Sequence, residues 1–423
     1  MGWDSRSRAL VMLASFLAVF LALDADPAAT PDALLQPLST SLPVRVGDRF
    51  LSRARWLALK TTLSCWMHSG RWARAGSAAA EGADLLPPLY DRLVPTHIRN
   101  PGRHRDLYSD ETCGPVQERV GLDLLWAVPR TCARVPAFSP AAMCRAMRGR
   151  TLVFIGDSLM IGQFEAMIQA MAHGRPDWDG DYHSIGTFRH RLASWDHNVM
   201  NENPVVQHLY SFCADEAGSK PFRMMLTINW KFRGYEPLRM PPETAESAYW
   251  VPHRHFLKKE HDSNGLVFVV NRGAHWDEDA VAEDGLLRFL RMVHEDMSNA
   301  TVIFRSTNLV HVNCSHYMDP PPGTPPFDPS TYEFVHDPRW HWRDIAIQSD
   351  NVSKAVMNAV RDPAGIFLDI TPSSSLRPDL HRGGTDRTLG HDCLHFCLPN
   401  PMVDLWNHAG FGVLQLIDEL ASA

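Results

Sequence analysis

A buried strand that ends in Gly-Asp-Ser and runs directly into a helix constrains this chain more than any other feature. The apolar run 151–155 predicts the strand, and apolar residues at helical spacing from Leu159 to Met171 predict the helix. The same alternation returns later in the chain, as strand 265–270, helix 279–297, strand 301–306 and strand 366–370. Successive strand-helix-strand units imply parallel strands, so the sequence predicts an α/β fold with a mostly parallel sheet covered on both faces.

The N-terminus has the pattern of an export signal. Two arginines precede an uncharged, mostly apolar run from Ala9 to Leu23, and two aspartates follow it. Because the positive charge lies on the N-terminal side alone, residues 1–23 are expected to be a signal peptide or a signal anchor. The apolar run is shorter than the roughly 20 residues that span a typical bilayer, so cleavage and anchoring both stay open.

The rest of the chain divides into three parts by composition. Residues 24–64 are rich in Ala, Pro, Leu and Arg without a motif, which indicates a stem or linker. In residues 65–150, Trp, Pro and Cys recur with little periodicity, so we expect a loop-rich N-terminal subdomain held by disulfides. Residues 151–423 then form the main domain, which contains the predicted sheet.

The number of cysteines and the net charge indicate which cell compartment and which kinds of binding partner to expect. The eight cysteines form an even set, which is compatible with up to four disulfides in an oxidising compartment. Three triplets fit the N-glycosylation pattern, at Asn299, Asn313 and Asn351. Asp and Glu total 48 against 41 Lys and Arg, for a formal charge of -7, so the chain lacks the basic field that nucleic acid would require.

Ser158 is the first candidate for chemistry. A serine at the start of a helix that follows a buried strand lies at the carboxyl edge of the sheet, beside unpaired backbone N–H groups. Its hydroxyl is suited to act as a nucleophile, and the N–H groups can stabilise a developing oxyanion. The alternative is that Asp157 or Ser158 only caps the helix, since both residue types are favoured caps.

A serine nucleophile needs a base, and the segment His-Asp-Cys-Leu-His near the C-terminus offers one. Asp392 and His395 lie three residues apart, so in a helical turn the carboxylate can orient the imidazole. Three other interpretations stay open: a zinc site formed with Cys393 and Cys397, a packed His395, or His391 as the base. We expect no metal, because no second ligand cluster at conventional spacing appears and export would oxidise the thiols.

A third element follows the second predicted strand, where the chain reads Asn271-Arg-Gly273-Ala-His275-Trp276. Strand ends at one edge of a parallel sheet converge on one crevice, so the Asn271 amide and the Gly273 N–H are further candidate oxyanion donors. The alternative is a simple turn that contains Asn and Gly.

Taken in order, these segments resemble the PC-esterase group of the SGNH/GDSL superfamily. The likeness rests on Gly156-Asp-Ser158, on the loop 271–276, and on the run from Asp392 to Pro399 followed by Asp404-Leu-Trp-Asn407. Within that group the chain is similar to the plant trichome-birefringence-like polysaccharide O-acetyltransferases. Their N-terminal module also looks similar from Cys65 onward.

The resemblance implies an SGNH-hydrolase-like three-layer sandwich for residues 151–423, which become the catalytic domain. The site residues that it implies are Ser158 as nucleophile, His395 as general base, Asp392 as its orienting acid, and Ser158, Asn271 and Gly273 as oxyanion donors. Substrate contacts are expected from Gln163, His275 and Trp276.

The implied reaction moves an acetyl group through a serine ester to a hydroxyl of a glycan or cell-wall polysaccharide. The same triad serves an acetylesterase when water is the second acceptor, and a non-catalytic glycan-binding protein is a third alternative. The acetyl donor is a co-substrate, and no bound cofactor is expected. Together with the export signal, the resemblance predicts a Golgi membrane protein, single-pass and type II with a lumenal catalytic domain. The alternative is a secreted protein.

Overall fold

The computed structural model describes residues 43–89, 122–172, 205–213, 220–228, 251–272, 274, 279–308, 351–354, 356, 365–381 and 392–422. Residues from Pro43 onward form one compact unit. The predicted export signal lies outside the described residues. Within the described ranges, none of the helices combines the length and the apolar character needed to cross a bilayer.

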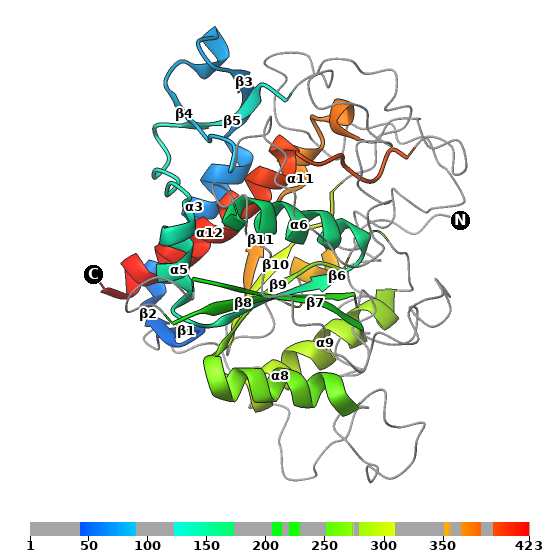
Figure 1. The fold of residues 1–423 in the computed structure, drawn as a ribbon. Helices are drawn as coiled ribbons and strands as arrows, with labels where there is room; N and C mark the ends of the chain where they lie inside the picture. Colours follow the sequence, from blue (N-terminus) through cyan, green and yellow to red (C-terminus); the bar gives the residue numbers. More distant parts are fainter. Residues whose placement is uncertain are drawn as a thin grey trace, which may run out of the picture. The chain divides into compact units, whose positions relative to one another are not determined.

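A six-stranded sheet forms the centre of the fold, in the order β11-β10-β9-β6-β8-β7 (Figure 1). Its strands are β6 (Thr151–Gly156), β7 (Val205–Phe212), β8 (Phe222–Ile228), β9 (Leu266–Val270), β10 (Thr301–Arg305) and β11 (Ile366–Leu368). All neighbours pair in parallel except β7, which runs antiparallel to β8 at one edge. The strands predicted from the apolar runs are therefore confirmed as β6, β9, β10 and β11, and the mostly parallel α/β class is confirmed with them.

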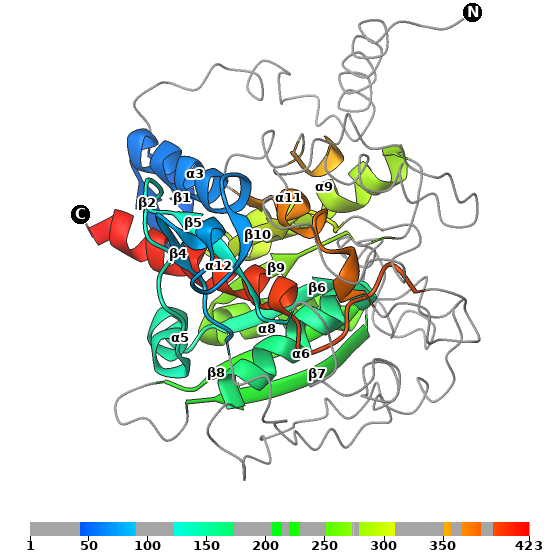
Figure 2. The same cartoon turned by 90° about the horizontal axis from the view of Figure 1, so that it is seen from above.

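Helices cover both faces of this sheet (Figures 1 and 2). One face carries α3 (Arg53–His68), α5 (Pro140–Met147), α6 (Ser158–Ala172) and α12 (Pro401–Ser422), and the other carries α8 (Val251–Asn264) and α9 (Asp279–Asp296). Alternate residues of β6 enter the two cores: Phe154 packs in the cluster that contains α6 and α12, and Ile155 in the cluster that contains α8 and α9. Both faces of the central strand are therefore buried, as its continuous apolar run predicts.

The segment expected to be a stem is folded from Pro43 onward, so the prediction of a linker over 24–64 is wrong for its second half. The strands β1 (Val44–Val46) and β2 (Arg49–Leu51) pair as a hairpin that leads into α3. Leu59 and Leu63 of α3 are buried in the same apolar core as α12. Burial of these leucines makes the helix part of the compact unit instead of a spacer.

A small antiparallel sheet lies in the N-terminal part of the chain, in the order β3-β5-β4. Its strands are β3 (Arg71–Arg74), β4 (Ala83–Leu85) and β5 (Leu124–Pro129), with a short 3-10 helix, η1 (Ala78–Ala80), between β3 and β4. Two further short helices, α11 (Thr371–Ser374) and η6 (Pro378–Leu380), follow β11.

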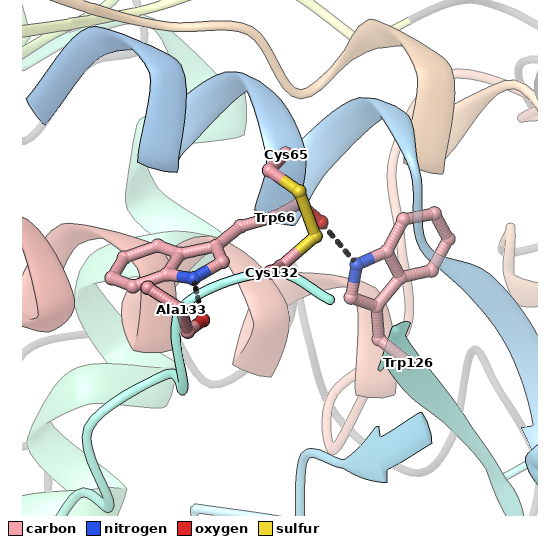
Figure 3. Close-up of a disulfide and its surroundings, with 5 residues drawn as sticks. All are labelled: Cys65, Trp66, Trp126, Cys132 and Ala133. Carbon is pink, nitrogen blue, oxygen red and sulfur yellow. Dashed lines mark hydrogen bonds between the residues drawn. A yellow bond between two sulfur atoms is a disulfide. The ribbon is translucent and has the colours of Figure 1, made fainter. Parts of the chain in front are cut away.

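The Cys65–Cys132 disulfide joins α3 to the segment that follows β5 (Figure 3). Beside it, the indole N–H of Trp66 donates to the carbonyl of Ala133 at 2.6 Å, and that of Trp126 donates to the carbonyl of Trp66 at 2.8 Å. These bonds satisfy two buried indole donors, so the tryptophans fix the helix against the small sheet.

Further disulfides tie the fold together. Cys144 of α5 is bonded to Cys213 at the end of β7. Cys393 and Cys397, near the C-terminus, are also disulfide-bonded. The prediction that the cysteines serve as covalent links is therefore confirmed for these residues.

Candidate active site

Ser158 is the first residue of α6 and follows the central strand β6 through Gly156 and Asp157. The turn between strand and helix is crowded at Gly156, where an added Cβ would lie 2.9 Å from the carbonyl oxygen of Asn271 and 3.0 Å from the Cβ of Met160. A glycine lets the end of β9 and the start of α6 approach each other closely at this point. Ser158 therefore lies at the carboxyl edge of the sheet, as predicted.

Asp157, and not Ser158, caps the helix. Its carboxylate accepts the backbone N–H of Leu159 at 3.0 Å through Oδ1 and that of Ala274 at 2.7 Å through Oδ2. The residue is 1% exposed, so both bonds form away from solvent. The capping interpretation thus applies to Asp157, and it leaves the hydroxyl of Ser158 for another partner.

That partner is His395. The Oγ of Ser158 lies 2.7 Å from Nε2 of His395, and the other ring nitrogen, Nδ1, lies 2.9 and 3.1 Å from the two carboxylate oxygens of Asp392. Because an ionised carboxylate only accepts hydrogen bonds, Nδ1 carries the proton and Nε2 can accept the proton of the hydroxyl. Ser158, His395 and Asp392 therefore form a continuous hydroxyl, imidazole and carboxylate chain, which is the arrangement that activates a serine hydroxyl as a nucleophile.

Asp392 is held as an ionised acceptor by its surroundings. Burial raises the pKa of its carboxyl, but the hydrogen bond and charge of His395 and two backbone N–H donors outweigh burial and hold the pKa well below its usual range. Those donors are Leu394 at 3.2 Å and His395 at 3.1 Å. The side chain of His395 keeps 23% of its surface exposed, so a small molecule can reach the imidazole while the acid behind it stays sheltered.

The loop that carries His395 is fixed from three directions. The ring of His381 stacks on Phe396 at 4.4 Å between centroids, and its Nδ1 donates to the carbonyl of His395 at 3.1 Å. The amide of Asn308 donates to the carbonyl of Leu394 at 3.3 Å.

The two flanking cysteines, at 393 and 397, are disulfide-bonded, so their sulfurs are not thiolate ligands and the zinc interpretation is wrong. His391 lies outside the described residues.

Asn271 does not serve the oxyanion role that was predicted for its side chain. It is fully buried, and its Nδ2 donates to the carbonyl of Arg305 at 3.0 Å and to Oγ1 of Thr307 at 3.1 Å. An amide nitrogen has two hydrogens, and both are used inside the fold. The strand end converges on the site as expected, but the side chain points across the sheet edge toward β10.

Gln163 is 2% exposed, and its backbone carbonyl accepts the side-chain amide of Asn407 from α12 at 3.0 Å. Five residues after Ser158, an α-helix has turned to a direction about 140° away from the serine, so the two side chains leave the helix on different sides and the expected substrate contact is not seen. The predicted site residues Gly273, His275 and Trp276 lie outside the described residues.

Four consecutive buried polar residues at the end of β10 and directly after it, Arg305 to Asn308, were not predicted as part of the site. Thr307 accepts from Asn271, and Asn308 holds the loop of His395. The hydroxyl of Ser306 donates to Asp369 at 3.1 Å and accepts the N–H of Ile370 at 2.9 Å. Their position in the sequence could have predicted this role, because polar residues directly after a buried strand lie at the sheet edge where sites form in parallel sheets.

Comparison with known proteins agrees with this geometry. Residues 246–409 match the model of the PC-Esterase family, described as a GDSL/SGNH-like acyl-esterase family found in Pmr5 and Cas1p. The matched range contains Asp392 and His395, and Ser158 precedes it.

Several plant proteins are similar over about two thirds of the chain. Xylan O-acetyltransferase 2 of Oryza sativa subsp. japonica is 24% identical over 66% of this chain and 58% of its own length. Xyloglucan O-acetyltransferase 4 of Populus trichocarpa is 29% identical over 69% of this chain and 70% of its own. Protein trichome birefringence-like 38 of Arabidopsis thaliana is 25% identical over 68% and 72%. The chain thus spans 58% of the length of the rice relative. Residues 246–409 therefore resemble the PC-esterase family, and about two thirds of the chain resembles the plant trichome birefringence-like proteins.

Proposed function

We propose that this protein is an O-acetyltransferase that moves an acetyl group through Ser158 to a hydroxyl of a glycan or cell-wall polysaccharide. The observation that carries the proposal is the 2.7 Å contact between the hydroxyl of Ser158 and Nε2 of His395, with Asp392 behind the imidazole. The family match and the names of the xylan and xyloglucan relatives support the same reaction class.

In the first step, Oγ of Ser158 attacks the carbonyl carbon of an acetyl donor while its proton passes to Nε2 of His395. Asp392 stabilises the imidazolium that forms. The leaving group takes that proton as its bond to the acetyl carbon breaks, which leaves an acetyl ester on Ser158. The backbone N–H of Ser158, at the positive end of α6, and that of Gly273 are the proposed donors to the oxyanion.

In the second step, a sugar hydroxyl gives its proton to Nε2 of His395 and attacks the serine ester. The new ester forms on the sugar, and Oγ of Ser158 recovers the proton as its bond to the acetyl carbon breaks. Each step moves one proton and one acetyl group, so no resident cofactor is required. His275 and Trp276, in the loop that follows β9, remain proposed contacts to the acceptor.

The same triad acts as an acetylesterase if water takes the place of the sugar hydroxyl. The description of the matched family as acyl-esterases favours this as the second candidate. A non-catalytic glycan-binding role is the third candidate, and it requires no reactivity at Ser158.

The proposed setting is the lumen of the Golgi, with the chain anchored through residues 9–23 as a single-pass type II protein, or secreted if that segment is cleaved. The chain from residue 151 would form the SGNH-like three-layer catalytic domain behind the disulfide-linked N-terminal module. Asn299 and Asn351 are exposed, which suits them as glycan acceptors in that compartment.

One experiment separates the candidates. The purified chain is incubated with 4-nitrophenyl acetate as acetyl donor and with xylan or xyloglucan oligosaccharides, and mass spectrometry follows acetyl groups on protein and sugar. A transferase gives acetylated sugar, an esterase gives acetate alone, and in both cases Ser158 carries the transient acetyl group.

Ser158→Ala is expected to abolish both products, while Ser263→Ala, a change of an exposed hydroxyl on α8, leaves them intact. Acetyl transfer that persists in Ser158→Ala would rule out the proposed nucleophile.

A further inference from the structure

A buried ion pair lies in the segment 373–381, which crosses from α11 through η6 to His381. The side chains of Arg377 and Asp379 are 0% and 1% exposed. Nε and Nη2 of the arginine each donate to a carboxylate oxygen of the aspartate at 2.8 Å. Because the burial of two charges offsets much of their attraction, such a pair adds little net stability, and its effect is to fix the backbone of the short segment that it closes.

On one side, the segment 373–381 is bound to the small N-terminal sheet. The indole N–H of Trp72, in the middle of β3, donates to the carbonyl of Ser373 at 3.0 Å, although the two residues are 301 positions apart. The guanidinium of Arg377 lies over the same indole, 4.8 Å from the ring centroid. Trp72 in turn packs edge-on against Trp126 of β5, at 5.1 Å between centroids. The small sheet therefore holds this segment by a hydrogen bond and by a cation–π contact.

On the other side, the end of the segment 373–381 is bound to the loop of His395. The carbonyl of Leu380 accepts the backbone N–H of Cys397 at 3.3 Å. Nδ1 of His381 lies 3.1 Å from the carbonyl oxygen of His395, and since a carbonyl can only accept, this nitrogen carries the proton and donates. The ring of His381 also stacks on Phe396. The backbone of His395 itself is thus one of the groups that the segment holds.

We propose that the small N-terminal sheet aligns the general base: Trp72 fixes the segment 373–381, and His381 at the end of that segment is a positioning residue for His395. The inference rests on the proposed function, in which His395 takes the proton of Ser158. Trp72 and His381 are each 6% exposed, so both act through the imidazole and not on substrate. The contact that they preserve is the 2.7 Å hydrogen bond of the imidazole to the serine hydroxyl, which a shift of about 1 Å would break.

The test uses the full chain and measures the rate at which a fluorophosphonate labels Ser158. In that reaction the serine oxygen bonds to phosphorus, fluoride leaves, and His395 takes the proton, so the rate reports the alignment of the two groups without a sugar acceptor. Rates are expressed per folded molecule, with the folded fraction measured by circular dichroism. A loss of stability is then not counted as a loss of alignment.

Two variants of His381 separate its hydrogen bond from its ring. His381→Phe keeps a ring to stack on Phe396 and removes the donor, and it is expected to slow labelling on the order of 10²-fold. His381→Asn keeps an N–H donor close to the place of Nδ1 and removes the ring, so it should recover much of the lost rate. The control is His408→Phe on α12, because His408 is also buried and donates to a backbone carbonyl, that of Pro87 at 2.7 Å. It should label at the wild-type rate.

Two tryptophans of the N-terminal part make the second matched pair. Trp72→Phe keeps an aromatic ring in β3 and removes the N–H that is bonded to Ser373, and it is expected to slow labelling, though less than His381→Phe does. Trp66→Phe makes the same chemical change nearby, but the N–H that it removes is bonded to Ala133 and not to the segment 373–381. Trp66→Phe should therefore label at the wild-type rate per folded molecule, whatever its loss of stability.

Two more measurements separate alignment from general damage. With 4-nitrophenyl acetate, His381→Phe should lower kcat and leave KM within about threefold, because both chemical steps need His395 and the changed residue does not touch substrate. The double variant Trp72→Phe/His381→Phe should label no more slowly than His381→Phe alone, since both changes interrupt the same line of contacts.

A wild-type labelling rate in folded His381→Phe or in folded Trp72→Phe would overturn the inference and leave the proposed nucleophile intact. Equal slowing in a variant and its control, or fully additive effects in the double variant, would also overturn it. If His381→Phe fails to fold, the comparison of Trp72→Phe with Trp66→Phe decides alone. A wild-type chain that is never labelled at Ser158 overturns the proposed function and this inference together.

Discussion

Gly412 on α12 lies so close to Trp66 on α3 that a Cβ at this glycine would be 2.7 Å from an atom of the indole ring. Both residues are buried, and the indole cannot easily retreat because its N–H is bonded to Ala133 beside the Cys65–Cys132 disulfide. The crossing of the first and last described helices therefore depends on the lack of a side chain at this position.

Gly412→Ala is expected to lower the free energy of unfolding by about 1–3 kcal/mol, because the added methyl group overpacks a rigid contact. Gly410→Ala is the control two residues earlier in the same helix, where a Cβ would meet no atom within 4 Å. There the change should raise stability by about 0.5–1 kcal/mol by reducing the freedom of the unfolded chain. Urea denaturation of both variants measures the difference, and equal effects would contradict the packing account.

Asp392→Asn is expected to lower the rate of acetyl transfer on the order of 10³–10⁴-fold while the fold persists. An asparagine amide donates where the carboxylate accepts, so it reverses the proton position on Nδ1 of His395 and leaves Nε2 unable to take the serine proton. The measurement is the initial rate with 4-nitrophenyl acetate. Asp262→Asn, which changes an exposed carboxylate paired with Lys258, is the control and should keep the wild-type rate.

The lowered pKa of the Asp369 carboxyl predicts how the free energy of unfolding changes at acidic pH. Burial alone raises the pKa of its carboxyl, but the hydrogen bond from His68 and the charge of Lys354 lower the pKa to about 2 from the ordinary value of 3.8. A depressed folded-state pKa contributes stability that is complete above about pH 4 and is lost as the pH falls toward 2. The contribution at neutral pH is about 2 kcal/mol.

Denaturation midpoints measured between pH 5 and pH 2 test this expectation. The wild type should lose stability more steeply than Asp369→Asn across this window, and the two curves should converge at the acid end. Asp123→Asn removes an exposed carboxylate that pairs with Arg74, and it should change the curve little. Parallel curves for the wild type and Asp369→Asn would show that the buried carboxylate is not stabilised by its partners.

Asn271→Ala tests whether this residue is a structural clamp or an oxyanion donor. The structure predicts that the variant loses about 1–3 kcal/mol of stability, because the carbonyl of Arg305 and the hydroxyl of Thr307 lose a buried donor. Thermal and urea unfolding measure the loss. Unchanged stability together with a rate on the order of 10²–10³-fold lower would restore the oxyanion role.

The triad could be predicted from sequence because each half of it lies in a short segment with a local reason for its residues. Ser158 follows a buried strand at a helix start, and Asp392 and His395 have the spacing of neighbours on one turn. Their meeting depends on parallel strands whose carboxyl ends share one edge, which the alternation of strands and helices predicted. Arg305 gave no comparable signal, because its side chain contacts Trp406 on α12, which lies far away along the chain.

The direction of a side chain was the least predictable property of the site. Asn271 lies where the sequence placed it, after β9, yet its amide turns toward β10, since Arg305 and Thr307 offer buried acceptors there. Residue type and position along the strand leave that choice open.

Apolar patterns predicted the strands β6, β9, β10 and β11 and the helices α6 and α9, and several other elements were missed. Strand β8 was missed because Phe222–Ile228 combines Met and Leu with Arg and Thr, a composition that suits a helix as well as a strand. Helix α12 was also missed, although Leu405, Ala409 and Val413 have the spacing of one helix face, in a segment that contains two glycines. In α3 a signal existed: Leu59, Leu63 and Trp66 have the spacing of one helix face, within a segment that looked like a linker.

Ser158 and His395 are separated by 237 positions along the chain. During translation Ser158 is added early and His395 near the end. The growing polypeptide therefore contains the proposed nucleophile without its base for most of its synthesis. Any reactivity that needs both groups begins only after the final tenth of the chain has emerged and docked. In fragments that end before this segment, Ser158 is therefore expected to be unreactive, even when the sheet has formed.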